Sequence, residues 1–216
     1  MIIEKTGDLL TEQADFIAHQ VNCRGIMGAG VAKQIRDRLL SPEQYRKYQR
    51  ACRDAAEGKG PASLLGHVER MPLPDGRQVV NLYAEDKPTG KGLDTDYHAL
   101  YSCLHRLAYF ATVGVDDSDR KTSIAIPGYI GCGLAGGDWD YVWSRILLPV
   151  FGRSSRVEFR IVYLESSVRQ LHGEFLAELG PDGTLARPWH QFPPKTPADM
   201  IEAWFAETFP DVRFTG

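Results

Sequence analysis

Short apolar runs rich in β-branched residues alternate, over most of the chain, with segments whose apolar residues recur at helical spacing. The runs predict six strands, at residues 2–5, 15–21, 67–73, 77–83, 123–127 and 157–164. The third and fourth strands are separated only by Pro74-Asp75-Gly76, a sequence typical of a hairpin turn. Because helical segments separate most of the other strands, the pattern predicts an α/β fold with a mixed, largely parallel sheet.

Helices are predicted at residues 31–40, 42–57 and 94–113, and from Asp138-Trp139 onward. The second helix has the clearest start, because Ser41 offers a hydroxyl N-cap and Pro42 occupies the first helical position. The third helix is amphipathic, with apolar residues at Tyr97, Leu100, Tyr101, Leu104, Leu107 and Ala108.

The pattern changes after Ser166, where a polar stretch leads to a Pro-Asp-Gly turn at residues 181–183. Thr196-Pro197-Ala198-Asp199 then resembles a capping box before a helix. The apolar stripe of that helix consists of Met200, Ile201, Trp204 and Phe205. We therefore expect one domain over residues 1–165 and a C-terminal extension over residues 166–216, with one helix that docks on the domain.

Two glycine-rich segments each follow a predicted strand and open a predicted helix: residues 22–30 (NCRGIMGAG) and 128–137 (GYIGCGLAGG). A loop of this kind directs backbone N–H groups and the positive end of a helix at its ligand, which suits phosphate. Neither loop has the Walker order. Taken alone, each loop is also explained as a turn whose backbone adopts positive φ and therefore favours glycine. Two such loops favour a binding site, because ligands of open α/β sheets gather at the carboxyl ends of the strands.

Composition limits the partners of this site. The chain has 25 Lys+Arg against 28 Asp+Glu and a formal net charge of −3, so nucleic acid is a disfavoured partner. The four cysteines lack C-x-x-C spacing, and His98 and His105 lack acidic neighbours, so we expect no metal and no cofactor. No stretch approaches the roughly 20 apolar residues of a membrane span, and the N-terminus has no signal-peptide pattern. We expect a cytoplasmic protein without a membrane partner.

Four motifs, in order along residues 1–165, resemble those of macrodomains. They are Gly7-Asp8-Leu9, Ala18-His19-Gln20-Val21-Asn22, Met27-Gly28-Ala29-Gly30-Val31-Ala32, and Pro127 with Ile130-Gly131-Cys132-Gly133-Leu134-Ala135-Gly136-Gly137-Asp138-Trp139. The chain is most similar to the branch that contains ADP-ribose-1″-phosphate phosphatases and terminal ADP-ribose glycohydrolases. The resemblance implies a three-layer α/β/α macrodomain whose ligand is ADP-ribose.

The resemblance also implies ligand-binding residues. Asp8 would accept a hydrogen bond from the adenine amino group, beside the Leu9 amide, and Asn22 would face the distal ribose. The loops would hold that ribose and the diphosphate through Gly28, Ala29, Gly30, Val31, Pro127, Ile130, Gly131, Cys132, Gly133, Leu134, Ala135 and Gly136. Tyr163 or Leu164 would flank the adenine. Asp8 also fits a structural role, as a side chain that caps the turn after the first strand. Tyr163 and Leu164 also fit positions in the apolar core.

The catalytic residues are less well defined, because the chain departs from the glycohydrolase relatives. Ala135 stands in place of their loop aspartate, and Glu85 in place of their lysine. The phosphatase-like relatives have a histidine where His19 stands, so His19 is the leading acid–base candidate. Glu85 and Asp138 are further candidates. A buried structural histidine explains His19 equally. For Asp138, a helix N-cap is preferred to a catalytic role. Glu85 also fits a solvated loop with Asp86 and Asp94.

The sequence therefore predicts a macrodomain that binds ADP-ribose and hydrolyses a group on its distal ribose, a 1″-phosphate or an ester-linked adduct. A non-catalytic reader of ADP-ribosylated protein or nucleic acid is the alternative. The replaced lysine and aspartate favour that alternative.

Overall fold

In the computed structural model, residues 1–113, 120–187 and 189–214 are described, and their strands form one six-stranded sheet. The strands are β1 (Ile2–Thr6), β2 (Phe16–Asn22), β3 (Val68–Pro72), β4 (Gln78–Glu85), β5 (Thr122–Pro127) and β6 (Val157–Tyr163). Their order is β1-β6-β5-β2-β4-β3. Only β3 and β4 pair antiparallel, through the predicted hairpin, and the other neighbours pair parallel. The mixed, largely parallel sheet is confirmed.

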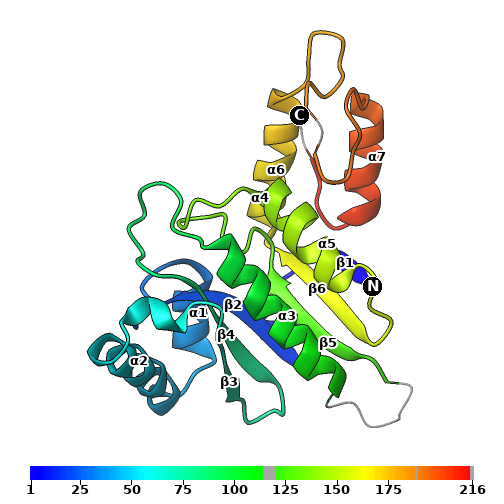
Figure 1. Cartoon of the computed structure of the whole chain (residues 1–216). Coiled ribbons are helices and arrows are strands. Elements are labelled where there is room, and N and C mark those ends of the chain that lie inside the picture. The colour runs from blue at the N-terminus through cyan, green and yellow to red at the C-terminus, as the bar shows by residue number, and fades with distance from the viewer. Residues whose placement is uncertain (114–119, 188, 215–216) are drawn as a thin grey trace.

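Helices cover both faces of the sheet (Figure 1). One face is covered by α1 (Gly30–Arg38) and α2 (Pro42–Glu57), and the other by α3 (Tyr97–Val113) and a continuous helix over residues 139–151. That helix comprises α4 (Trp139–Tyr141), the π-helical η3 (Val142–Leu147) and α5 (Leu148–Phe151). Two short 3₁₀ segments, η1 (Leu9–Thr11) and η2 (Pro61–Leu64), join other elements. The architecture is the expected three-layer α/β/α arrangement.

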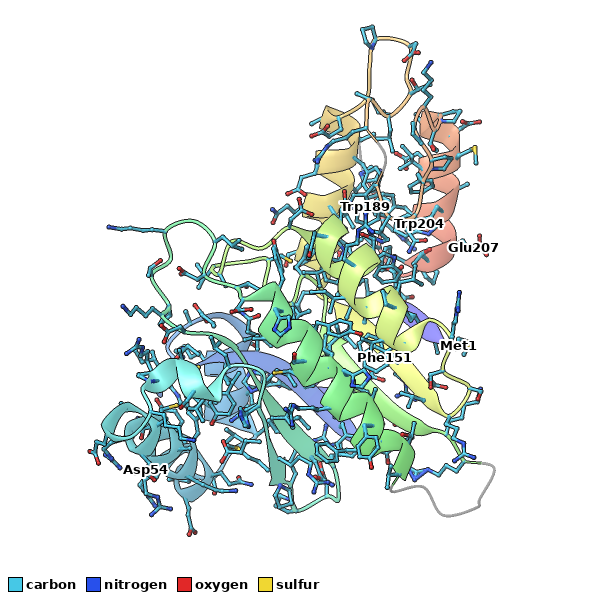
Figure 2. The ribbon with its side chains drawn as sticks, viewed as in Figure 1. Met1, Asp54, Phe151, Trp189, Trp204 and Glu207 are labelled. Atoms are coloured by element: carbon cyan, nitrogen blue, oxygen red, sulfur yellow. The ribbon has the colours of Figure 1, made fainter. Side chains whose placement is uncertain are left out.

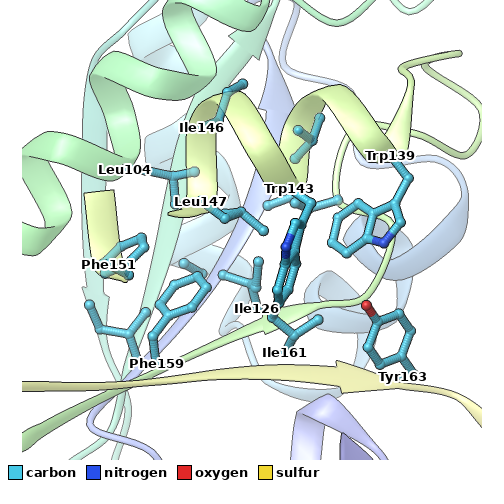
Figure 3. Packing of buried hydrophobic residues seen from close by; sticks show 14 of the residues in the cluster. Leu104, Ile126, Trp139, Trp143, Ile146, Leu147, Phe151, Phe159, Ile161 and Tyr163 are labelled. Atoms are coloured by element: carbon cyan, nitrogen blue, oxygen red, sulfur yellow. The ribbon is translucent and has the colours of Figure 1, made fainter. Parts of the chain in front are cut away.

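The helix over residues 139–151 shows how the layers pack. Figure 3 shows Trp143, Leu147 and Phe151 pointing from one side of this helix toward the strands. The ring of Phe151 stacks on that of Phe159 in β6, with centroids 3.8 Å apart. Each of these side chains is nearly or wholly buried. Burial of a large apolar side chain stabilises a fold by about 1.5–3 kcal/mol, so this layer is a main source of stability.

Helix starts follow the local sequence where capping chemistry is present. Ser41 and Gln44 form a reciprocal capping box, in which each side chain accepts a hydrogen bond from the other residue's backbone N–H, and α2 begins at Pro42 as predicted. The third helix begins at Tyr97 rather than at the expected Asp94. The N–H groups of Asp94 and Thr95 donate instead to the carbonyl of Ala135, which ties this segment to the second glycine loop.

The extension contains two helices, not the one expected. The first, α6 (Glu165–Ala177), follows β6 directly and buries Val168, Leu171 and Phe175 at helical spacing. The second, α7 (Ala198–Thr208), lies where a helix was predicted but lacks the predicted capping box. The Thr196 hydroxyl donates to the carbonyl of Pro193 instead.

Aromatic side chains join the two extension helices to each other and to the sheet. Figure 1 shows α6 and α7 side by side beyond one end of the sheet, and Figure 2 shows Trp189 and Trp204 in that region. The ring centroids of Trp189 and Trp204 lie 5.8 Å apart. Phe209, just after α7, packs edge-on against Tyr163 of β6 at 5.3 Å. The buried residues of the extension belong to the same apolar cluster as those of α3 and β6.

Within the described parts of the chain, the longest helices are too short or too polar to cross a membrane.

Candidate functional site

A cleft of about 640 Å³ opens at the carboxyl ends of β2, β4, β5 and β6. The parallel strands end at this edge, so the loops that follow them meet here. Most of the predicted ligand-binding residues line this cleft: Asp8, Leu9, Asn22, Gly28, Ala29, Gly30, Val31, Pro127, Ile130, Gly131, Gly133, Leu134, Ala135 and Leu164. The two glycine loops, more than 90 residues apart in sequence, therefore form walls of one cavity.

The first glycine loop is shaped by Asn22. Its side-chain oxygen accepts hydrogen bonds from the N–H groups of Arg24 at 3.0 Å and Ile26 at 3.2 Å. Its amide nitrogen donates to the carbonyl of Ile26 at 2.6 Å, and the Tyr48 hydroxyl donates to the Asn22 carbonyl. Asn22 is buried, so its side chain fixes the loop that presents Gly28–Gly30 to the cleft.

The amino end of α1 faces the cleft without a side-chain cap. Ala29 occupies the N-cap position, and no side chain accepts a hydrogen bond from the first turn there. Gly30 has a φ of +56°, which a β-carbon would strain. The first-turn N–H groups of a helix lack intrahelical partners, and the helix dipole adds positive charge at this end. The first loop can therefore bind an anion through its backbone.

The second glycine loop is held by the segment that precedes α3. The Thr95 hydroxyl donates to the carbonyl of Gly131 at 2.6 Å. Gly136 has a φ of +67°, and a β-carbon added there would lie 2.1 Å from the carbonyl oxygen of Gly92. Gly133, in contrast, has no neighbouring atom within 4 Å of such a β-carbon. Gly136 is thus required for packing, whereas Gly133 faces the open cleft.

Cys132 and Gly136 do not line the cleft, unlike the rest of the loop predicted around them. The Cys132 thiol donates to the carbonyl of Ile130, and Gly136 packs against Gly92.

Asp8 and Leu164 lie at one end of the cleft, where β1 and β6 end. The Asp8 carboxylate accepts a hydrogen bond from the Leu10 N–H at 3.0 Å, which caps η1, and lies 3.1 Å from the Arg38 guanidinium. Leu164 is half-exposed beside the cleft. Tyr163 is wholly buried, and its hydroxyl donates to Glu4 at 2.9 Å. Of the two residues considered for the adenine, only Leu164 faces the cavity.

Glu85 lines the cleft from the last position of β4. It pairs with Asn22 of β2, and the register between the strands shifts just before this pair. Partial burial, and secondarily the nearby Asp94 carboxylate, raise the pKa of Glu85 to about 7. Both effects disfavour the charged form. A carboxyl group with this pKa exchanges protons near neutral pH, as a general acid–base residue must.

The loop after Glu85 is an ordered wall, because Asp94 anchors it. One Asp94 carboxylate oxygen accepts a hydrogen bond from the Thr89 hydroxyl, and the other accepts from the Gly90 N–H at 2.7 Å. Pro88, Thr89 and Gly90 line the cleft as a result. Residues 87–93 are nevertheless exposed, so the solvated loop considered as an alternative also describes this segment. Among the described residues, no lysine lines the cleft.

His19 does not line the cleft. It is wholly buried in β2, and its Nε2 lies 2.8 Å from the side-chain oxygen of Asn81 in β4. An amide oxygen only accepts hydrogen bonds, so Nε2 carries the proton and donates it. Burial lowers the pKa of His19 to about 4. Side chains alternate between the faces of a strand, and His19 shares the face of Ile17 and Val21 beneath α1 and α2. Its position does not favour the expected acid–base role.

Asp138 is a helix N-cap. Its carboxylate accepts a hydrogen bond from the Tyr141 N–H at 2.9 Å, and its own N–H donates to the Tyr97 hydroxyl at 2.7 Å. It lies outside the residues that line the cleft. The capping interpretation accounts for this residue, and Glu85 alone of the three catalytic candidates reaches the cavity.

Several residues that line the cleft were not predicted, among them Gln20 and Ser167. Gln20, next to His19 but on the opposite face of β2, donates to the Thr95 hydroxyl at 3.0 Å. Its position within the second motif was the available signal. Ser167, in the first turn of α6, also lines the cleft. No signal pointed to it, because the motifs end before the extension.

Metal binding finds no support in the site. Within the described ranges, no group of three or more His, Cys, Asp or Glu side chains is placed to hold a metal ion. The four cysteines are free thiols.

Several solved structures with this architecture are macrodomains. The macrodomain of Mycobacterium tuberculosis DarG has a TM-score of 0.58 and 24% identity, covering 76% of this chain and 97% of that one. A macrodomain protein from Streptomyces coelicolor has a TM-score of 0.58 and 23% identity, covering 76% and 98%. Thermosipho africanus DarTG in complex with ADP-ribose has a TM-score of 0.54 and 18% identity, covering 73% and 40%. The chain has the macrodomain fold.

Two proteins named for an enzymatic activity match part of the chain. A DNA ADP-ribosyl glycohydrolase of Mycobacterium tuberculosis is 29% identical over 153 residues, which is 68% of this chain and 38% of that protein. The Mycobacterium bovis protein of the same name matches to the same extent. The chain thus spans less than half the length of these relatives. No protein-family model matches the chain.

Proposed function

We propose that the cleft binds ADP-ribose, with the diphosphate between the two glycine loops. The observation that carries this proposal is the meeting of both loops across one cavity at the carboxyl ends of β2 and β5. Their backbone N–H groups, together with the amino end of α1, supply donors that suit phosphate oxygens. The ADP-ribose complex of a protein with the same fold supports the choice of ligand.

The ends of the cleft differ in a way that orients this ligand. At one end, Asp8 offers a carboxylate oxygen to the adenine amino group, and Leu164 an apolar side chain to the adenine ring. At the other end, the distal ribose would lie between the first glycine loop and Glu85. Asn22 contributes by fixing that loop, since its polar atoms are already hydrogen-bonded.

The proposed reaction is hydrolysis at C1″ of the distal ribose. Glu85 in its ionised form would take a proton from water as the water oxygen bonds to C1″. The bond from C1″ to the attached group then breaks, and the group leaves with the electron pair and takes up the proton. The products are ADP-ribose and the released group. The mycobacterial relatives are named as ADP-ribosyl glycohydrolases, and this name supports cleavage of the bond at C1″.

We propose that the group released from C1″ is a 1″-phosphate or an ester-linked adduct. A non-catalytic reader is the second candidate. It is favoured by Ala135 in the second loop and by the absence of lysine from the described cleft residues.

We also propose a cytoplasmic location, because free thiols suit a reducing compartment.

Turnover assays separate the two candidates. The parent chain and Glu85→Gln would be incubated with ADP-ribose-1″-phosphate, with ADP-ribosylated protein and with ADP-ribosylated single-stranded DNA, and released ADP-ribose would be measured. Calorimetry on the same samples would measure ADP-ribose binding. Release by the parent alone supports the hydrolase. Tight binding without release on any of the three substrates supports the reader.

A further inference from the structure

Tyr129, in the second glycine loop, has a backbone conformation that side chains rarely adopt. Its φ is +61°, in the left-handed region, and among the described residues Lys195 is the only other non-glycine residue with a positive φ. A β-carbon makes this conformation unfavourable, so it persists where surrounding contacts impose it. Tyr129 lines the cleft two residues after β5, and its carbonyl accepts a hydrogen bond from the Cys132 N–H at 2.8 Å. The strained residue therefore sets the direction in which the loop leaves the sheet.

Aromatic packing holds Tyr129 in this conformation. Its ring packs against two others, with centroids 5.4 Å from Trp139 and 5.7 Å from Tyr163. Figure 3 shows these two residues close together where the helix over residues 139–151 meets the end of β6, and their ring centroids are 6.1 Å apart. Gly128 lets the chain pass beside Tyr163, since a β-carbon there would lie 2.2 Å from that ring. We call Trp139 and Tyr163 the aromatic clamp.

The C-terminal extension holds the Tyr163 side of the clamp. Phe209 packs edge-on against the Tyr163 ring at 5.3 Å, and both residues are wholly buried. The Gln191 amide donates to the Glu4 carboxyl group at 2.6 Å, and the same carboxyl group accepts from the Tyr163 hydroxyl at 2.9 Å. Tyr163 is thus fixed by one apolar contact and one hydrogen-bonded bridge from the extension.

The Trp139 side of the clamp meets a buried histidine of the extension. The His190 side chain is wholly buried, with its ring edge-on to Trp139 at 6.3 Å and 4.4 Å from the Trp143 ring. Its Nδ1 lies 3.5 Å from the Asp140 carboxylate, which is longer than an ordinary hydrogen bond. Ring packing is therefore the main contact between the extension and this side of the clamp.

We propose that Tyr129 is a positioning residue for the diphosphate of ADP-ribose, and that the C-terminal extension keeps it in the left-handed conformation through the aromatic clamp. This inference rests on the proposed function of the cleft. The second glycine loop directs its N–H groups at the phosphates only while the chain turns at Tyr129. If the loop relaxes in the free protein, the ligand must restore its shape, and the affinity falls by the fraction of protein that remains competent to bind.

Three substitutions of Tyr129 separate positioning from packing, with ADP-ribose affinity measured by calorimetry below the melting temperature of each protein. Tyr129→Phe keeps the ring in the clamp, so its affinity should stay within about twofold of the parent. Tyr129→Ala loses the ring but keeps a β-carbon, so the loop should relax and the affinity fall about 5- to 30-fold. Tyr129→Gly also loses the ring but adopts positive φ freely, so its affinity should fall only about 2- to 5-fold.

The order of the alanine and glycine variants is the critical result, because packing alone predicts the reverse order. Alanine fills more of the space left by the ring than glycine does, so a purely structural Tyr129 would make Tyr129→Gly the weaker binder. Tyr129→Gly that binds no more tightly than Tyr129→Ala would overturn the positioning role. Parental affinity in Tyr129→Ala would overturn it as well.

Phe209→Leu and Phe205→Leu test the part played by the extension. Both phenylalanines are wholly buried, so both substitutions should lower the melting temperature to a similar extent. Among the described residues, the rings packed against Phe205 all belong to the extension, whereas Phe209 also contacts Tyr163. We expect ADP-ribose affinity to fall about 3- to 10-fold in Phe209→Leu and to stay nearly parental in Phe205→Leu.

Equal loss of affinity in the two phenylalanine variants, or no loss in Phe209→Leu, would overturn the role of the extension. A parent chain that does not bind ADP-ribose would contradict the proposed function of the cleft itself. A parent that binds, together with Tyr129 variants that all keep its affinity, would overturn this inference and leave the proposed function standing.

Discussion

Glu85 of β4 lies opposite Asn22 of β2, immediately after the register between the two strands shifts by one residue. The pairing brings two different functions to one point. Asn22 is buried and holds the first glycine loop in shape, whereas Glu85 lines the cleft with a pKa raised to about 7. The loop proposed to bind an anion and the carboxyl group proposed to exchange a proton are thus positioned by one pair of strands.

Substitution of Glu85 tests its catalytic role. If Glu85 takes the proton from water, Glu85→Gln should slow turnover by about 10²–10⁴-fold and leave ADP-ribose affinity nearly unchanged. A general base must be deprotonated, so parental turnover should rise with pH and level off above about 7. That rise should vanish in the residual activity of the variant.

Asp86→Asn is the matched control, because Asp86 is adjacent in sequence but pairs with Arg24 and does not line the cleft. Loss of turnover in Asp86→Asn as large as in Glu85→Gln would contradict a specific role for Glu85.

Two glycines of the second loop should respond differently to the same substitution. Gly133→Val should fold normally and lose ADP-ribose binding, because its β-carbon meets only the open cleft. Gly136→Val should lower the free energy of unfolding by about 1–3 kcal/mol, because it forces a strained backbone against Gly92. Urea denaturation and calorimetry measure the two effects. A Gly133→Val protein that binds as the parent does would place the diphosphate elsewhere.

Asp8 can be tested separately from the turn that it caps. Asp8→Ala should weaken ADP-ribose binding roughly 10- to 100-fold, the usual effect of losing a hydrogen bond to a charged group. Arg38→Ala removes the ion pair of Asp8 but keeps the acceptor, so its affinity should stay within about threefold of the parent. Equal affinities of the parent and Asp8→Ala would rule out adenine recognition by this residue.

Glu4 should make stability depend on pH. Burial raises the pKa of Glu4 to about 7, despite hydrogen bonds from Tyr163 and Gln191, and its pKa in the unfolded chain is about 4.5. The folded state therefore holds the proton more tightly. The stabilisation is fully present below the unfolded pKa and is lost as the pH rises through about 7.

Glu4→Gln should remove this dependence, with its amide oxygen accepting from Gln191 and its NH₂ group donating to the Tyr163 hydroxyl. Relative to the variant, the free energy of unfolding of the parent should fall by about 2 kcal/mol between pH 5.5 and 8.5. Comparison of parent with variant at each pH cancels the contributions of His19 and His190, whose pKa values burial lowers. A constant difference across this range would show that Glu4 is ionised throughout.

Sequence patterns predicted the features that depend on local chemistry. The strands, the N-cap at Ser41 and both glycine loops were found because short-range periodicity, capping chemistry and glycine content determine them. Most residues of the cleft followed from the order of the four motifs.

Features that depend on long-range packing were missed. His19 looked like an acid–base residue, but strand alternation buries it under α1 and α2. The sequence did not show that Asp94 holds the exposed loop at residues 88–90 beside the cleft. Helix α6 escaped prediction because polar residues interrupt its apolar stripe, and with it the contribution of Ser167.

We propose that ADP-ribose binds between the two glycine loops, and a crystal structure of the chain with ADP-ribose would show whether it does. We expect the diphosphate in contact with backbone N–H groups of both loops, the adenine beside Asp8 and Leu164, and C1″ of the distal ribose facing Glu85 across the space of one water molecule. A diphosphate that contacts neither glycine loop, or a distal ribose at the Asp8 end of the cleft, would contradict it.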